Sequence, residues 1–385
     1  MSIFITFFKT YLKYITPLFI ILASHPISAS VQQQIGSLDT TRAGNFSFVN
    51  GQYFDQARAS LVSNFSEVTL TSTTNITPEF LETVNVFILG AANSCCTAIT
   101  PLTVLEQQAL VDFVVGGGSL IVHADNDLFH HTAAAVNESF LAPFGLAATG
   151  TLHGHVSSTV QNPSSSPITS GDFGVINYLI EIFPGAFSEL GNAIPLASND
   201  LGPSLAVLDA GSALPTGEVI RGKAVFFSES TLFVDNNIWF VNSTDIPHLE
   251  LLSNLIDFAL TPPIIKIQID IKPSSHTNNI NINTSSVIPV ALLSTNDFNT
   301  TTDIDLSTIS IAGANVKLLG NGGTHLCNNE DVNTDGLMDI VCLIETSQVM
   351  IELGQSLAAL EAKTHEGILV HGEDFINIFQ TSLGH

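Results

Sequence analysis

Oxygen-bearing side chains recur at a regular spacing between Asp331 and Asp339. They occupy positions 1, 3, 5 and 9 of this segment, and Gly336 stands at position 6. Calcium takes about six to eight hard oxygen ligands, and a tight turn with oxygens at alternate positions supplies them from one short segment. The backbone carbonyl at position 7 would add one more. The sequence therefore predicts a calcium site whose ligands are Asp331, Asn333, Asp335, Leu337 and Asp339.

The flanks of this segment differ from those of an EF-hand. Cys342 stands where an EF-hand carries its bidentate Glu, and 324–326 and 340–344 have the composition of strands. We therefore predict a calcium loop that closes a β-hairpin. Cys327 would then face Cys342 across the hairpin and form a disulfide. The alternative is an Asx-rich turn without a metal, because Asn, Asp and Gly are common in turns.

A second group of polar residues follows a predicted strand at 119–124. His123, Asp125, Asp127, His130 and His131 lie within nine positions. In an open α/β sheet, ligands bind beyond the carboxyl ends of the strands. Imidazoles and carboxylates at such spacing suit zinc or a similar transition metal, which would activate water for hydrolysis. The alternative is structural: Asp125 or Asp127 would cap a helix at 127–140.

Three further residues are candidates for the same strand-end site. His153 and His155 are expected on the next strand and on the same face, and Glu229 follows a predicted strand at 224–228. The alternative for Glu229 is a turn or capping role in a segment rich in Ser and Thr. A metal-dependent hydrolase would use His123, Asp125, Asp127, His153 and Glu229.

The elements that position these residues fall into two halves. From Asn50 to Leu260, segments with strand and helix patterns alternate, which predicts a doubly wound α/β domain of the flavodoxin or amidotransferase type with a parallel sheet. In this half, Thr100 is expected to cap a helix that ends at Gly116. Beyond Thr261-Pro262-Pro263, apolar and polar residues alternate as in Ile265–Ile271, which predicts an antiparallel β-sandwich.

Three segments of the second half carry a resemblance. They are Ile269–Pro273, Val287–Thr295 and Glu330–Asp339. Together they resemble a calcium-loop β-module found at the ends of many exported bacterial proteins. The resemblance covers about 115 residues and implies a module that accompanies other domains rather than a catalyst.

The first half resembles the class I glutamine-amidotransferase-like superfamily, in its non-catalytic or uncharacterised exported branch. The matching segments are Val84–Gly90, Gly116–His123 and Gly222–Ser230. Active members place a Cys nucleophile on the turn after a strand. Here that turn reads Ala124-Asp125-Asn126-Asp127, without Cys or Ser, so the resemblance implies a fold without its covalent chemistry.

The N-terminus and the overall charge indicate where the protein acts. Met1–Ala29 reads as a signal peptide, with Lys9 and Lys13 before a short apolar run; the alternative is a membrane anchor. No later segment predicts a membrane span. The net charge of −25 excludes nucleic acid as a partner. The predicted domains are the signal peptide 1–29, the α/β domain 30–261 and the β-sandwich 262–385.

These observations favour an exported, calcium-stabilised binding or structural protein with an extracellular ligand or protein partner. They predict that this protein has no catalytic residue and that its metal is calcium. The second hypothesis is the hydrolase described above, with a transition metal at the strand ends.

Overall fold

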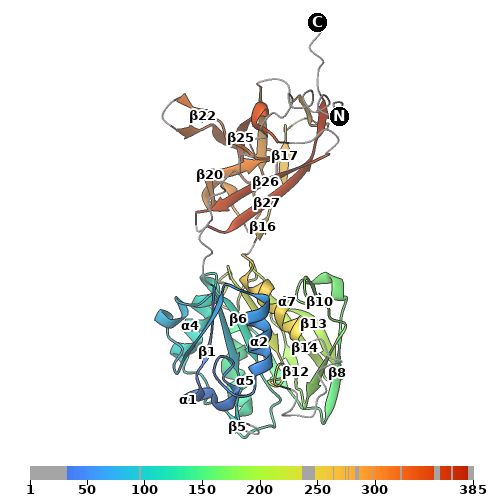
Figure 1. The fold of residues 1–385 in the computed structure, drawn as a ribbon. Helices are drawn as coiled ribbons and strands as arrows, with labels where there is room; N and C mark the ends of the chain where they lie inside the picture. Colours follow the sequence, from blue (N-terminus) through green and yellow to red (C-terminus); the bar gives the residue numbers. More distant parts are fainter. Residues whose placement is uncertain are drawn as a thin grey trace, which may run out of the picture. The chain divides into compact units, whose positions relative to one another are not determined.

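The structure of this chain is a computed structural model. It describes 33–94, 97–235, 248–262, 264–273, 275, 277–281, 286–296, 298–320, 323–350, 356–365 and 367–379. The predicted signal peptide, Met1–Ala29, lies outside these residues. We call the described residues from 33 to 262 the α/β part and those from 264 to 379 the β-rich part (Figure 1).

The α/β part contains a mixed sheet of nine strands within the described residues, in the order β11-β8-β13-β14-β15-β6-β3-β1-β2. Five strands run parallel: β2 (Val68–Thr73), β1 (Gln33–Leu38), β3 (Val86–Gly90), β6 (Ser119–His123) and β15 (Lys223–Phe227). Four are antiparallel to their neighbours: β14 (Gly202–Leu208), β13 (Ile194–Asn199), β8 (His155–Val160) and β11 (Tyr178–Ile182).

The prediction of a parallel sheet was therefore correct for only half of the sheet. Two residues, Asp200 and Leu201, join β13 to β14. A parallel connection needs about a dozen residues to cross over, so a link this short forces antiparallel pairing.

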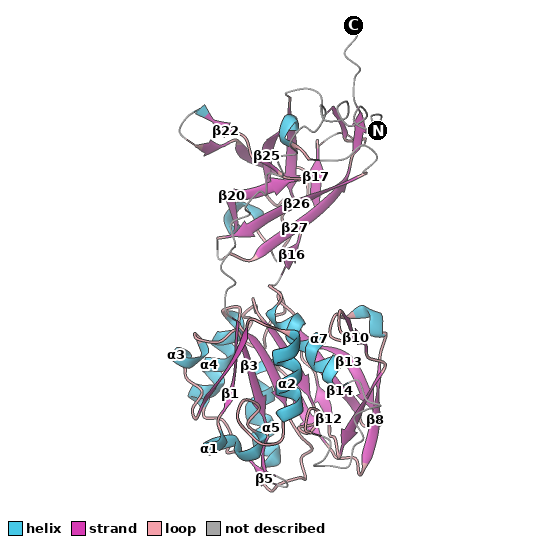
Figure 2. Cartoon of the chain, viewed as in Figure 1, coloured by secondary structure: helices cyan, strands magenta, loops and turns pink. Residues whose placement is uncertain are grey.

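Helices cover both faces of this sheet (Figure 2). Successive residues of a strand point to opposite faces, and Phe87 and Ile88 accordingly belong to two different core clusters. The first cluster includes residues of α4 (Val104–Val115) and α5 (Ala133–Leu141), and the second includes residues of α2 (Asp55–Asn64) and α7 (His248–Leu260). Smaller elements are α1 (Thr40–Ala43), α3 (Pro78–Leu81), β4 (Ala92–Ser94), β5 (Thr97–Ala98), β7 (Ala147–Thr149), β9 (Ser170–Gly171), β10 (Gly174–Val175) and β12 (Ala186–Glu189).

The cap of α4 corrects one prediction. Thr103, not Thr100, caps the helix: its hydroxyl accepts a hydrogen bond from the Glu106 backbone N–H, and the Glu106 carboxylate accepts one from the Thr103 N–H at 2.9 Å. Glu106 also forms a buried ion pair with Arg42. A Thr followed by Glu three residues later is the capping-box signature, and this sequence signal was missed.

Thr103→Ala should lower the free energy of unfolding by about 1 kcal/mol, because the orphan N–H of Glu106 loses its partner. Urea denaturation measures the change. Thr100→Ala is the matched control, since Thr100 precedes the helix, and it should leave stability nearly unchanged. Equal losses in the two variants would contradict this assignment.

The β-rich part consists mainly of two sheets. The first has the order β16 (Ile264–Lys266), β27 (Leu369–Phe375), β26 (Leu357–Thr364), β20 (Ile304–Ile311) and β21 (Ala314–Asn315). The second has the order β17 (Ile269–Ile271), β19 (Val287–Leu292), β25 (Asp339–Glu345) and β24 (Cys327–Glu330). Smaller elements are α8 (Thr300–Asp303), β18 (Asn279–Asn281), β28 (Asn377–Phe379), β22 (Leu318–Leu319) and β23 (Thr324–His325). One apolar cluster contains residues of both sheets.

Two details of the β-rich part differ from the prediction. The strand expected over Ile265–Ile271 is broken into β16 and β17, which belong to different sheets. The change of sheet occurs at 267–268, where the Ile267 N–H donates to His371 and the Gln268 carbonyl accepts from Leu293. In addition, β16 and β27 pair in parallel, as do β18 and β28, so the pairing is not antiparallel throughout.

Candidate functional site

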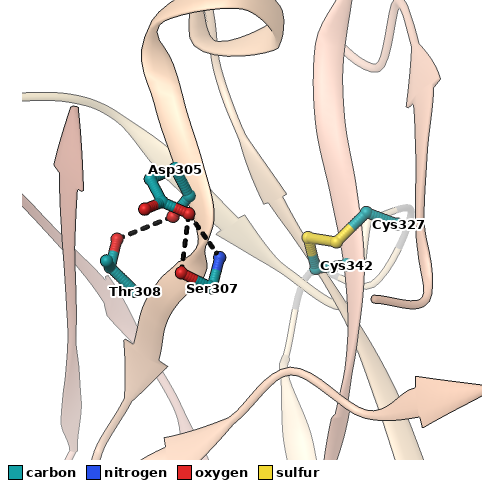
Figure 3. The surroundings of a disulfide bond; sticks show 5 residues. All are labelled: Asp305, Ser307, Thr308, Cys327 and Cys342. Carbon is teal, nitrogen blue, oxygen red and sulfur yellow. Dashed lines mark hydrogen bonds between the residues drawn. A yellow bond between two sulfur atoms is a disulfide. The ribbon is translucent and has the colours of Figure 1, made fainter. Parts of the chain in front are cut away.

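The predicted calcium loop closes a β-hairpin, as expected. Strands β24 and β25 pair antiparallel from Cys327 opposite Cys342 to Glu330 opposite Asp339, so 331–338 forms the connection. A disulfide joins Cys327 to Cys342 across the two strands (Figure 3). The same figure shows Asp305 near the start of β20, where its carboxylate accepts hydrogen bonds from the N–H and hydroxyl of Ser307. The disulfide fixes the register of the hairpin that carries the loop.

Side-chain oxygens within the loop are turned toward its own backbone. Asp331 accepts hydrogen bonds from the N–H groups of Asp335 at 3.1 Å and Gly336 at 3.0 Å, and Asp335 accepts one from Leu337 at 2.8 Å. Thr334 and Gly336 have φ angles of 61° and 89°. The chain therefore reverses sharply around these carboxylates, which brings their oxygens to the inside of the turn.

Asp339 is the buried end of the loop, with 0% of its surface exposed. Its two carboxylate oxygens accept hydrogen bonds from Ser294 N–H at 2.7 Å and Val332 N–H at 3.0 Å. A carboxylate has about four acceptor positions, so these bonds leave room for a cation. Oxygen donors of this type suit calcium, although no set of three His, Cys, Asp or Glu side chains in the described part of the chain is placed as a formed metal site.

The second candidate site is a cavity of about 290 Å³ at the carboxyl ends of β6 and β15, which we call the strand-end pocket. These two strands pair in parallel from Ser119 and Lys223 onward, so the residues that follow each strand meet at one edge. The pocket is lined by Phe46, Ala92, Ser94, Asp125, Asn126, Leu128, Phe129, Thr151, His153, Ile182, Phe183, Ser230 and Thr231.

Asp125 forms the acidic centre of the strand-end pocket. The Ser230 hydroxyl donates to one of its oxygens, and Asn126 donates to the other from its N–H at 2.7 Å and from its amide at 3.0 Å. Burial outweighs these hydrogen bonds and raises the pKa of Asp125 to about 7. This carboxyl therefore exchanges its proton near neutral pH.

Glu229 is 1% exposed and lies close enough to Asp125 for their charges to interact. Burial raises its pKa well above the ordinary value, and the charge of Asp125 raises it further. One carboxyl oxygen accepts hydrogen bonds from the N–H and hydroxyl of Thr231. The other, Oε2, is buried and has no hydrogen-bond partner among the described residues. Two acidic groups thus share a poorly solvated region at the end of β15.

His123 is not a ligand in this arrangement. Its ring stacks on Phe227, with 4.7 Å between ring centroids, and its Nδ1 lies 3.2 Å from the backbone oxygen of Glu229. Burial lowers the pKa of His123 to about 4, so the imidazole is neutral. It does not line the strand-end pocket. Its role is packing at the end of β6.

The remaining members of the predicted cluster separate. Asp127 accepts a hydrogen bond from Asn137, and neither Asp125 nor Asp127 caps a helix, since α5 begins only at Ala133. His153 does line the strand-end pocket, but it precedes β8 and lies in a loop. His155 opens β8 and pairs with Ile182, but its side chain is exposed and does not line the pocket. His130 and His131 contact each other, with 4.0 Å between ring centroids.

Sequence reasoning missed three residues of the strand-end pocket: Asn126, Phe183 and Ser230. Asn126 donates to the backbone oxygen of Phe183 at 2.7 Å as well as to Asp125, and so connects two walls of the pocket. Ser230 directly follows Glu229, and the same rule on strand ends that selected Glu229 would have included it. No sequence signal marks Phe183, whose φ of 52° is unusual for a bulky side chain.

Among the residues that the structure describes, no helix has the length and apolar character needed to cross a membrane.

Comparisons with known proteins give structural similarity only. No protein-family model matches this chain, and no curated protein matches its sequence. A solved structure titled "mmIFT52 N-terminal domain" is 15% identical with a TM-score of 0.42, and covers 60% of this chain and 97% of that one. A cytoplasmic protein from Salmonella typhimurium is 12% identical with a TM-score of 0.41, and covers 60% of this chain and 99% of that one. A second one, from Salmonella typhimurium LT2, is 13% identical with a TM-score of 0.38, and covers 59% of this chain and 99% of that one.

Proposed function

We propose that this chain is an exported ligand-binding protein. Its α/β part would bind a small molecule in the strand-end pocket, and calcium would stabilise its β-rich part. The observation that carries the proposal is the strand-end pocket itself, where aromatic and aliphatic walls surround a few converging polar groups such as Asp125 and Ser230. Ligand sites of α/β proteins have this composition and this position at the strand ends.

Binding is a better account of the strand-end pocket than hydrolysis. Of the five residues predicted for a metal-dependent hydrolase, only Asp125 and His153 line it. Two side chains are fewer than the three protein ligands that a catalytic zinc site uses. The proposal includes a doubly wound, amidotransferase-like ancestry without the nucleophile, since the turn after β6 carries neither Cys nor Ser.

A small-molecule library tests the strand-end pocket. Ligand-observed NMR with cationic, neutral and anionic fragments should give hits for the full chain. Thr151→Phe should abolish them, because the ring would fill the cavity that Thr151 lines. Thr216→Phe, at an exposed turn, is the control and should keep them. Hits that survive Thr151→Phe, or a library without hits, would overturn the assignment of this pocket.

Calcium should raise the stability of the β-rich part, and magnesium should not, because magnesium requires a tighter octahedron. Extracellular sites bind with Kd values of about 0.1–1 mM, so about 10 mM calcium should add about 1.4–2.7 kcal/mol. Calorimetry of the full chain measures the shift.

Asp331→Ala and Asp335→Ala should each remove most of this calcium effect. Glu330→Ala is the matched control, because Glu330 is an exposed acid directly before the loop and is not a predicted ligand. A calcium shift that is unchanged in the two loop variants would show that the loop is an Asx-rich turn without a metal.

A further inference from the structure

The charge of the strand-end pocket restricts its ligands. Among the described residues that line it, Asp125 is the one acidic residue, and none is Lys or Arg. Glu229 adds a second buried acid close to Asp125. An anionic ligand would meet two carboxyl groups with no Lys or Arg in the described lining to compensate them, which a poorly solvated site disfavours.

We propose that the strand-end pocket binds a small quaternary ammonium ion, with its charge beside Asp125 and its methyl groups against the rings of Phe129 and Phe183. This inference rests on the proposed ligand-binding function and names the ligand class.

The hydrogen bonds of Asp125 favour a quaternary ammonium over a protonated amine. Three donors, from Asn126 and Ser230, already occupy its two oxygens. About one of the four acceptor positions of the carboxylate is then left for the three N–H groups of a protonated primary amine. A quaternary ammonium has no N–H to satisfy and can neutralise the carboxylate from outside this network, as aromatic-lined sites for methylated ammonium groups do.

The walls of the strand-end pocket supply the aromatic surface that such a cation prefers. Phe46, Phe129 and Phe183 all line it, and Phe183 leaves 47% of its surface exposed. The left-handed conformation of Phe183, with a φ of 52°, is held by the Asn126 amide at 2.7 Å from its carbonyl. Strain of this kind is concentrated at binding sites. Asn126 thus connects the acid to the aromatic wall.

Affinity for the cation should increase with pH. Binding favours the ionised form of Asp125, and burial raises the pKa of that group to about 7 in the free protein. Glu229, whose pKa is also raised, adds negative charge when it ionises, and His123 stays neutral above about pH 4. His153 is the other ionisable side chain in the pocket lining. Each ionisation makes the pocket more negative as pH rises and therefore favours the cation. If only the ionised form of Asp125 binds the cation, a pKa of about 7 gives an increase of about 90-fold in affinity between pH 5 and pH 8.

Calorimetric titration of the full chain tests this inference with choline and with dimethylbutanol, the uncharged analogue in which carbon replaces the quaternary nitrogen. Choline should bind at least about tenfold more tightly than dimethylbutanol at pH 8. Asp125→Asn should remove this preference, and Phe129→Leu should weaken choline about tenfold. Glu181→Gln is the control: it removes a buried carboxyl outside the pocket lining and should retain the preference for choline.

Each outcome of the titration decides one question. If dimethylbutanol binds as tightly as choline, the cation inference is wrong while the pocket assignment stands. If Asp125→Asn folds with the parent's circular dichroism and keeps the preference for choline, the inference is also wrong. If neither compound binds but anionic fragments give hits that Thr151→Phe removes, the pocket binds a different class. If nothing binds at all, both the inference and the pocket assignment fail.

Discussion

Replacement of both Cys327 and Cys342 by alanine should lower the free energy of unfolding of the β-rich part by about 3 kcal/mol. The disulfide closes a loop with a sequence separation of 15 residues, and it therefore removes conformational freedom from the unfolded chain. For a part of about 100 residues, this loss corresponds to a decrease in Tm of more than about 10 °C. Calorimetry of the full chain measures it.

Two controls identify the disulfide as the cause. Dithiothreitol should lower the Tm of the parent by a similar amount and should not affect the double variant. Hydrogen exchange should increase in β24 and β25 and remain unchanged in β6 and β15, which belong to another sheet. A double variant whose Tm equals that of the parent would mean that the hairpin holds its register without the bond.

The α/β part should become less stable as pH rises from about 4 to about 8, through Asp125 and Glu181. Burial raises the pKa of both groups to about 7. Because the folded state holds these protons more tightly than the unfolded state, stability is fully present below the ordinary carboxyl pKa and is lost as pH rises toward 7. At about 1.4 kcal/mol per pKa unit, these changes correspond to about 4 kcal/mol for Asp125 and about 3 kcal/mol for Glu181.

A single variant isolates this contribution from that of the other carboxyls. Asp125→Asn keeps the size of the side chain and cannot ionise. Its free energy of unfolding minus that of the parent should therefore be about 4 kcal/mol higher at pH 8 than at pH 4. Urea denaturation at both pH values gives the difference. Asp305→Asn should show the opposite sign, because hydrogen bonds from Ser307 lower the pKa of Asp305. If the difference in free energy of unfolding between Asp125→Asn and the parent is the same at both pH values, burial does not raise the pKa of Asp125.

Local features could be predicted from the sequence because their causes are local. The loop between Asp331 and Asp339 lies between two strands that pair directly, so its spacing and its two flanking cysteines were sufficient to predict the hairpin and the Cys327–Cys342 bond. Strands β6 and β15 were also predicted to within one residue, since each is a short, largely apolar run. Two local signals were misread: the cap at Thr103 and the late start of α5 at Ala133.

The strand-end pocket was decided by tertiary structure. Pairing of β6 with β15 brings Asp125 to Ser230, about a hundred residues apart in sequence, and the loop after β11 adds Phe183. The sequence placed His123 and His155 in one site, but His123 stacks on Phe227, and His155 is exposed outside the pocket lining. Spacing along the chain determines which residues follow a strand; the order of the strands and the course of the loops that join them determine which of those residues meet.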